Sequence, residues 1–598
     1  MTLFSTHLFP ESIVRDAAIL VDESGVAGSL EAWIKSDQKH RGGRATTLST
    51  RTVLIAWVSV ALERGPLHMT RVAEVLSSRL SPATAAILCV PWDFAEVSDH
   101  QMYDRVNRAT KRILDVLDFK PLSTRQRRLT KAEWDAELEK RLANEDHNEV
   151  KRQRMFRFAN DLLHAQYLSL PEVVRRDKVS LTIDATFLSA FGRGMGKEKR
   201  AAQRPEERVI SEPDADWYIR TYESEDSRSA IRKSGFGWEY ELAAIISNDP
   251  HQPRAVPHIV IGFNHHIPNV GSNDGAREIF EDVINRGLMI DYAVADQAYF
   301  PGARAEVLQN FLRGHGAKLV MKYAKSQADR EAKGEGTIQA EAHGAILVEG
   351  HWYCPALPSV QRAAVVEYQN ALSADRKNPK LSNAQRQARA VEHKARMQAQ
   401  VKERERWEVR PKESADERGN YPMRCPASGP SRTLECPLKP GQKPLKAGKV
   451  ALPVLHPPKA PGQICTNASS VKFNVNDGGK YEQHHRYKSP EWQLIHSYGR
   501  QVIESFNGSL KHADNELAAS GTRRLRGEVG QAFLTLLGVL ATNASRIEEW
   551  QAHNFDGTAA PDALSRHART TRTVTVRPRA SRKGMSASRK AQLGLGSR

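Results

Sequence analysis

Three acidic residues in this sequence occupy positions from which they could do chemistry together. Asp184 follows the apolar run Leu-Thr-Ile in a predicted strand over 178–188, and we expect that strand to end at the aspartate. Asp296 occupies the same kind of position in the predicted strand 289–300. Two neighbouring carboxylates repel each other and resist desolvation unless a cation neutralises them. A pair of divalent ions held by carboxylates is the setting that calls for this, with Glu504 as the third acid.

The third acid lies in the segment SYGRQVIESFNGSLKH, residues 497–512, whose periodicity predicts an amphipathic helix. At about 100° per residue its apolar residues gather on one side: Val502, Ile503, Phe506 and Leu510. Arg500, Glu504 and Lys511 fall on the opposite side. Alone, this face indicates only a solvated surface with an Arg–Glu pair at i, i+4. With two further acids in reach, the same face predicts a carboxylate flanked by two cations that grip an anion, with Asn507 beside them.

Two of these patterns resemble signatures of one protein family, the DDE transposases of bacterial insertion sequences. The residues Asp-Gln-Ala-Tyr at 296–299 resemble the D-x-(G/A)-(F/Y) signature. Arg500-x3-Glu504-x6-Lys511 is similar to the Y-x2-R-x3-E-x6-K signature, although Tyr498 precedes the arginine by two positions instead of three. The resemblance covers roughly 178–325 and 480–550.

The resemblance implies a metal-dependent DNA transposase that cleaves phosphodiester bonds at transposon ends and joins them to target DNA. It implies a ribonuclease-H-like catalytic domain and a synaptic homodimer bound to double-stranded DNA. The catalytic residues and ligands of two Mg²⁺ or Mn²⁺ ions would be Asp184, Asp296 and Glu504. The DNA-binding residues would be Arg500, Lys511, Asn507 and Tyr498.

The elements that must position these residues indicate an α/β fold. The segments 178–188, 236–247 and 257–267 read as three strands, followed by a helix over 275–288, the strand 289–300, a helix that begins at Pro301 and the strand 317–325. This order predicts a mixed sheet with an antiparallel side. Glu504 lies 208 residues after Asp296, so a large insertion must precede the last acid.

Five regions follow from these changes of character along the chain. Residues 1–150 read as a helical N-terminal domain, with helices at 51–64, 69–88 and 103–118, that could bind DNA. The catalytic core occupies 175–325 and 481–555, and the latter part includes an apolar helix over 527–550. The insertion, 326–480, contains charged helices and a Cys/Pro-rich segment. The basic tail, 556–598, is predicted to be disordered.

Other acidic residues and several histidines are also candidates for a functional site. Asp291 is expected to begin its strand at the surface, and Asp214 and Asp216 are expected to remain solvated in a polar loop. The adjacent histidines of Asn-His-His (264–266) and His-His-Arg-Tyr (484–487) are expected at the surface or on DNA.

Four of the five cysteines lie in the predicted insertion: Cys354, Cys425, Cys436 and Cys465. Their spacing lacks the close cysteine pair of a usual zinc site, so two interpretations stay open. They are unrelated, partly buried thiols, or they form a structural four-cysteine Zn²⁺ site. The fifth, Cys89, lies in an apolar run and is expected to be buried.

Charge and hydropathy limit the classes of function. The net charge is +18, with 88 Lys and Arg against 70 Asp and Glu, which favours a nucleic-acid partner. The first residues lack the pattern of a signal peptide, and no run of about 18 apolar residues predicts a membrane span. We therefore expect a cytoplasmic, nucleoid-associated protein. Two alternatives to a transposase stay open: an inactive relative that only binds DNA, and a stand-alone nuclease of the same fold.

Overall fold

The computed structural model describes residues 8–38, 46–91, 97–125, 127–222, 231–300, 304–323, 334–414, 416, 420–513 and 515–555. The predicted basic tail, 556–598, lies outside these ranges. None of the helices in the described part of the chain combines the length and the apolar character that a membrane crossing requires.

The N-terminal region is helical, as predicted. Its helices are α1 (Glu11–Glu23), α2 (Val26–Asp37), α3 (Thr50–Leu62), α4 (Met69–Ser78), α5 (Pro82–Leu88), α6 (Asp99–Leu117), α7 (Lys131–Ala143) and α8 (Glu145–Leu168). Nearly every residue of α3 is buried, which explains its continuous apolar sequence. Helix α8 continues past residue 150 toward the sheet, where the Asn160 side chain bonds both the N–H and the C=O of Phe263 (2.9 and 3.0 Å).

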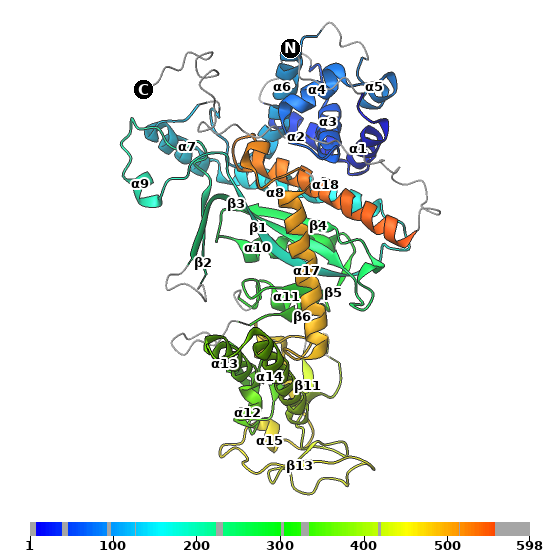
Figure 1. The fold of residues 1–598 in the computed structure, drawn as a ribbon, viewed down its shortest axis with the longest axis vertical. Coiled ribbons are helices and arrows are strands. Elements are labelled where there is room, and N and C mark those ends of the chain that lie inside the picture. The colour runs from blue at the N-terminus through cyan, green and yellow to red at the C-terminus, as the bar shows by residue number, and fades with distance from the viewer. Residues whose placement is uncertain are drawn as a thin grey trace. The chain divides into compact units, whose positions relative to one another are not determined.

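A six-stranded mixed sheet forms the middle of the fold (Figure 1). Its strands are β1 (Lys178–Ser189), β2 (Asp216–Tyr222), β3 (Ile231–Ile246), β4 (Val260–His266), β5 (Met289–Ala295) and β6 (Lys318–Met321). Strands β1, β5 and β6 run parallel, and β3 pairs antiparallel with β1, β2 and β4. The α/β class is confirmed, and each strand of the predicted series is present. The strand predicted over 289–300 ends earlier, at Ala295, because its pairing with β1 and β6 stops there. Strand β2 and the short helix α9 (Lys197–Ala201) were not predicted.

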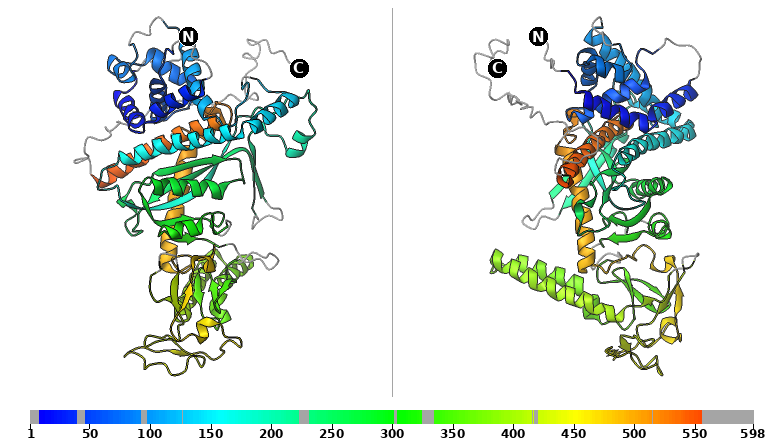
Figure 2. Two further views of the ribbon diagram at one scale, coloured as in Figure 1. Left: turned by 180° about the vertical axis from the view of Figure 1, so that it is seen from behind. Right: turned by 90° about the vertical axis from the view of Figure 1, so that its right-hand side faces the viewer.

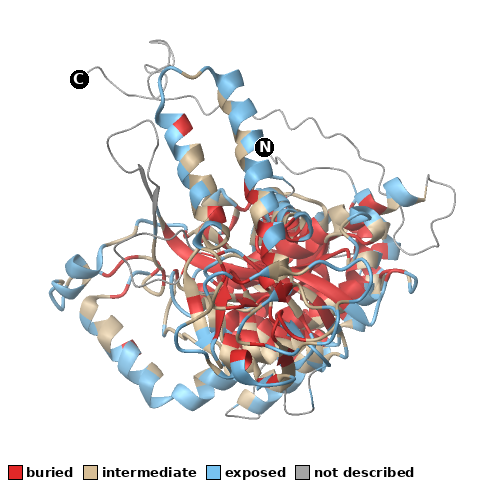
Figure 3. Cartoon of the chain, turned by 90° about the horizontal axis from the view of Figure 1, so that it is seen from below, coloured by how far each residue is buried: buried red, intermediate tan, exposed pale blue. Residues whose placement is uncertain are grey.

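Helices cover both faces of this sheet. On one face, a Cβ at Gly262 of β4 would lie 2.3 Å from Ile279, so glycine lets α10 (Ser272–Asn285) pack closely. On the other face, a Cβ at Gly499 would lie 3.0 Å from Val294, which brings α17 (Pro490–His512) against β5. The remaining helices here are α11 (Gln309–Gly314) and α18 (Glu528–Asn554). Figure 3 shows the buried residues gathered where these layers meet.

Between β6 and α17 the chain forms a smaller region, in which a pair of longer helices accompanies short helices and strands. Its helices are α12 (Ser359–Arg362), α13 (Ala364–Lys377), α14 (Asn383–Glu403), α15 (Gln463–Thr466) and α16 (Val475–Gly478). Its strands are β7 (Ile338–Ala342), β8 (Ala345–Val348), β9 (His351–Tyr353), β10 (Arg410–Pro411), β11 (Tyr421–Arg424), β12 (Leu434–Glu435), β13 (Leu452–Pro453) and β14 (Val471–Phe473), in three small sheets. The charged α13 and α14 lie side by side as a hairpin (Figure 2), as the sequence predicts for helices here. The small sheets were not predicted.

Candidate active site

One guanidinium group contacts all three of the predicted acids. Nη1 of Arg500 lies 3.2 Å from Oδ1 of Asp184. Its Nη2 lies 2.9 Å from Oε1 of Glu504 and 3.9 Å from Oδ2 of Asp296. The structure therefore brings Asp184, Asp296 and Glu504 together around a single cation, although they are far apart in the sequence.

The register between two parallel strands sets the positions of the two aspartates. Ile183 on β1 pairs with Ala295 on β5, and this is the last pair of that ladder. Asp184 follows Ile183, and Asp296 follows Ala295. The two aspartates therefore lie at the same height in the sheet, just past the end of this ladder. The Asp296 carboxylate also accepts a bond from the N–H of Gln297 (2.7 Å), which turns the chain away from the sheet.

Strand β1 does not end at Asp184, so that part of the prediction was wrong. The strand continues to Ser189 because its other edge stays paired with β3, where Asp184 lies opposite Leu242. Only the pairing with β5 stops at the aspartate. The carboxylate thus projects from the middle of a well-held strand.

Helix α17 supplies the third acid from a rigid support. It begins at Pro490, where the Ser489 hydroxyl accepts a bond from the N–H of Trp492 (3.2 Å), and it crosses the sheet (Figure 1). Arg500, Glu504, Asn507 and Lys511 recur at three- or four-residue spacing, so they share one stripe of the helix. The small Gly499 lets this stripe approach β5 closely.

Burial and neighbouring charges shift the pKa values of the side chains in the cluster. Burial raises the pKa of the Asp184 carboxyl; Arg500 lowers it, and Asp296 and Glu504 raise it further. Burial lowers the pKa of the Lys511 amine, while Asp184 opposes that shift. The side chain of Glu504 is the most exposed of the three acids, at 62% against 21% and 29%. The cluster therefore opens to solvent on the side of α17.

The donor set suits a hard divalent cation. Carboxylate oxygens are the ligands that Mg²⁺ prefers, and three of them meet here with one guanidinium as their positive partner. In the described residues no group of three or more His, Cys, Asp or Glu side chains is already arranged to hold a metal ion. At this cluster it is Arg500 that supplies the positive charge.

Asn507 reaches the site through the aspartate. Its Nδ2 donates to Oδ2 of Asp184 at 3.4 Å, so its amide helps to orient that carboxylate. Its Oδ1 is buried and accepts no hydrogen bond within the described residues. The sequence predicted Asn507 on this face, but not its contact with Asp184.

Tyr498 lies apart from the acids. Its hydroxyl donates to the carbonyl of Pro253 (2.9 Å), accepts a bond from the N–H of Ser247 (3.0 Å) and contacts Nε2 of His258 (2.8 Å). These partners belong to the connection between β3 and β4. The structure therefore gives Tyr498 a role in fastening α17 to the sheet.

Tyr498→Phe is expected to lower the free energy of unfolding by about 1–2 kcal/mol, since it removes these bonds and leaves a buried N–H unsatisfied. DNA affinity, measured by fluorescence anisotropy, is expected to stay within about twofold, which is ~0.4 kcal/mol. A large loss of affinity in a variant of unchanged stability would instead make Tyr498 a DNA contact.

A buried network beneath the site was missed by the sequence interpretation. Glu241 on β3 is fully buried and accepts hydrogen bonds from the hydroxyl of Tyr299 and from Nε2 of His266 (2.7 Å). The N–H of Tyr299 also donates to the carbonyl of Asp296 (3.2 Å). The network thus anchors the turn that carries the second aspartate. Alternation along β3 and β4, which puts an acid and a histidine on one inner face, was the only signal for it.

Several polar residues expected at the surface are buried with partners. His265 lies 3.1 Å from Glu528, and His266 binds Glu241 as described, so the surface prediction for 264–266 was wrong. Asp291 is buried between Lys178 and Lys318, at 2.9 and 3.1 Å.

The predicted polar loop at 214–216 is also part of the fold. Asp214 pairs with Arg141 at 2.6 Å and its side chain is only 6% exposed. Asp216 begins β2. For Asp214, as for Asp291, a side chain distant in the sequence neutralises the buried carboxylate.

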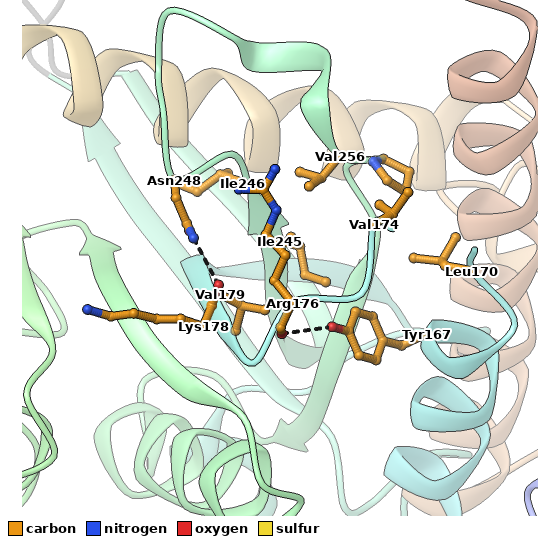
Figure 4. A pocket seen from close by; sticks show the side chains of 11 residues that line it. Tyr167, Leu170, Val174, Arg176, Lys178, Val179, Ile245, Ile246, Asn248 and Val256 are labelled. Atoms are coloured by element: carbon orange, nitrogen blue, oxygen red, sulfur yellow. Dashed lines mark hydrogen bonds between the residues drawn. The ribbon is translucent and has the colours of Figure 1, made fainter. Parts of the chain in front are cut away.

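None of the four cavities found in the described residues is lined by Asp184, Asp296 or Glu504. One, at the start of β1 (Figure 4), holds about 10 Å³, room for one water molecule. Another holds about 640 Å³ between β6 and the insertion, and basic and acidic side chains line it, among them Lys318, Glu408, Glu482 and Arg486. The four cysteines of the insertion lie in its own core instead, with three of them buried.

Comparison with known proteins does not assign this chain to a family. No family model matches the chain, and no curated protein or solved structure matches it either.

Proposed function

We propose that this protein is a DNA transposase of the DDE type, which cleaves phosphodiester bonds at transposon ends and transfers the strands to target DNA. The observation that carries the proposal is the convergence of Asp184, Asp296 and Glu504 on Arg500. The two sequence signatures single out Asp296, Arg500 and Glu504, and the predicted strand over 178–188 supplies Asp184.

The topology of the sheet supports a ribonuclease-H-like core. With β2 set aside, the spatial order is β4, β3, β1, β5, β6, in which the first three are antiparallel neighbours and the last two run parallel to β1. Asp184 lies on β1, and Asp296 directly follows β5. The third acid comes from the helix after the insertion, as the resemblance implies.

In the proposed reaction the three carboxylates would hold two Mg²⁺ or Mn²⁺ ions, which supply activation of the attacking hydroxyl or water and stabilise the leaving oxygen. Asn507 orients the Asp184 carboxylate, and the buried Glu241 holds the turn of Asp296 through Tyr299. The exposed Glu504 leaves the cluster open to a duplex. Arg500 and Lys511 present positive charge to its phosphates along one stripe of α17.

The charge of the chain supports DNA as the partner. With 88 Lys and Arg against 70 Asp and Glu, the chain carries an excess of 18 positive charges, which favours a polyanionic partner. We include in the proposal a homodimer that holds two transposon ends, DNA contacts by the N-terminal helices, and association with the nucleoid.

A nicking assay with supercoiled plasmid and Mg²⁺ tests the proposal. Glu504→Gln keeps the shape of the side chain but removes its charge, so cutting is expected to fall by at least about a hundredfold, or ~2.7 kcal/mol. DNA binding, measured in the same buffer without Mg²⁺, is expected to change little. Glu491→Gln, an exposed residue in the first turn of the same helix, is the matched control and should cut like the wild type.

Three outcomes separate the alternatives. Equal cutting by Glu504→Gln and the wild type would refute the assignment of the acids. A wild-type protein that binds DNA but never cuts it would point to an inactive relative. Cutting without joined products on oligonucleotides that carry the element's ends would point to a stand-alone nuclease.

A further inference from the structure

The part of the insertion around the cysteines has little regular structure to hold it together. Strands β10, β12 and β13 contain two residues each, and β14 contains three. The chain between them is rich in Pro, Gly and Lys. A segment with so little regular backbone pairing gains stability from an added cross-link or metal.

All four cysteines of the insertion meet in one apolar core. Cys354, Cys425 and Cys465 belong to the cluster of buried residues that includes Trp352, and Cys436 packs against it. They come from separate segments between residues 354 and 465, and none of them forms a disulfide. Four separate segments thus place every cysteine of the insertion in one core.

Three of the cysteines are held by the same local structure. Each begins a Cys-Pro turn that is closed by a bond from the backbone N–H three residues later to the cysteine carbonyl, at 2.9–3.0 Å: Leu357 to Cys354, Ser428 to Cys425 and Lys439 to Cys436. Proline in the second position favours such turns.

The four cysteines share a core that otherwise consists mainly of apolar side chains. As thiolates in such a core they would repel one another, and a positive ion among them would stabilise all four together.

We propose that Cys354, Cys425, Cys436 and Cys465 bind one structural Zn²⁺ ion that fastens the insertion. Four sulfur donors without an open position are the ligand set of a structural zinc site. The side chains in the described residues are not already arranged as a metal site, so the thiols must turn toward a common point to reach the Zn–S distance of about 2.3 Å. The turns leave the cysteine side chains free to do so, because they are closed by backbone bonds.

The metal content of the full-length protein tests this directly. After expression with added ZnCl₂ and purification without chelator, elemental analysis is expected to find about one zinc per chain. Replacing zinc with Co²⁺ should produce the strong near-ultraviolet absorption of thiolate-to-cobalt charge transfer. Cys89, at the end of α5, is exposed, so the sequence prediction that it is buried was wrong. Of the five cysteines, only Cys89 should therefore react with a thiol reagent in the native protein.

Variants locate the metal on these residues. Cys354→Ser/Cys436→Ser is expected to lose the zinc, and Cys89→Ser is expected to keep it. Zinc below about 0.1 per chain in the wild type, disulfides between these cysteines, or full zinc in the double variant would each overturn the proposal. Wild-type metal content and the cobalt spectrum decide the question even where the double variant fails to fold. None of these measurements depends on DNA cutting.

Discussion

Asp184→Asn is expected to lower the rate of DNA cutting by about a thousandfold, which corresponds to ~4 kcal/mol of lost transition-state stabilisation. The amide has nearly the same shape as the carboxylate but carries no charge, so it is a poor ligand for Mg²⁺. Of the three acids, Asp184 is held most firmly, since it projects from a strand paired with β3 and is contacted by Arg500 and Asn507. The measurement is single-turnover cutting of end-containing DNA over a range of Mg²⁺ concentrations.

The same variant separates a role in metal binding from a role in folding. Without Mg²⁺ its melting temperature should match or exceed that of the wild type, because one of three crowded negative charges is gone. Mg²⁺ should raise the melting temperature of the wild type and not that of the variant. Asp274→Asn, an exposed residue of α10, serves as control. Cutting by Asp184→Asn within about tenfold of the wild type, or ~1.4 kcal/mol, would contradict the assignment.

Arg404→Met is expected to destabilise the insertion by about 3–5 kcal/mol, the cost of leaving a buried charge without its partner. Arg404 and Glu349 are almost completely buried, at 1% and 0% exposure, and Nη1 of the arginine lies 2.5 Å from the carboxylate. The guanidinium also donates to the carbonyls of Gln361 and Arg362, at 2.7 and 3.2 Å, so the residue that follows α14 joins α12 to the turn after β8. Hydrogen exchange of the β7–β9 amides measures the local effect.

Arg389→Met, on α14, is the matched control. Arg389 pairs with Asp375 at 2.9 Å, but its side chain is 49% exposed, and Asp375 keeps His393 as a second partner at 3.0 Å. The loss is therefore expected to be about 1 kcal/mol or less. The double variant Arg404→Met/Glu349→Leu should recover much of the loss, because no charge is left buried alone. Equal losses for Arg404→Met and Arg389→Met would show that the buried pair does not hold the insertion.

Local sequence patterns were enough to predict the elements that carry the candidate site. The apolar residues before Asp184 and Asp296 predicted β1 and β5, and the helical spacing of Arg500, Glu504 and Lys511 predicted their common stripe on α17. The long gap before Glu504 required an insertion, and the chain folds one there. These features depend on residues within a few positions of each other, where strand and helix periodicity act.

What lay beyond prediction depends on partners far away in the sequence. The extension of β1 to Ser189 follows from its edge with β3, and the burial of Asp214 follows from Arg141. The pairing of Glu241 with His266 requires the register of β3 against β4. No local pattern encodes such a partner, because a buried charge is tolerated only where the fold brings its counter-charge within reach.

By itself, then, the sequence determined the strands and the helix that carry the candidate site, and it singled out three acids with a cationic stripe. Only the tertiary structure decided that one guanidinium meets all three carboxylates and that four scattered cysteines share one core. The physical reason is the range of the forces involved. Backbone periodicity is set by neighbours along the chain, whereas neutralising a buried charge and enclosing a sulfur cluster require segments that only folding brings together.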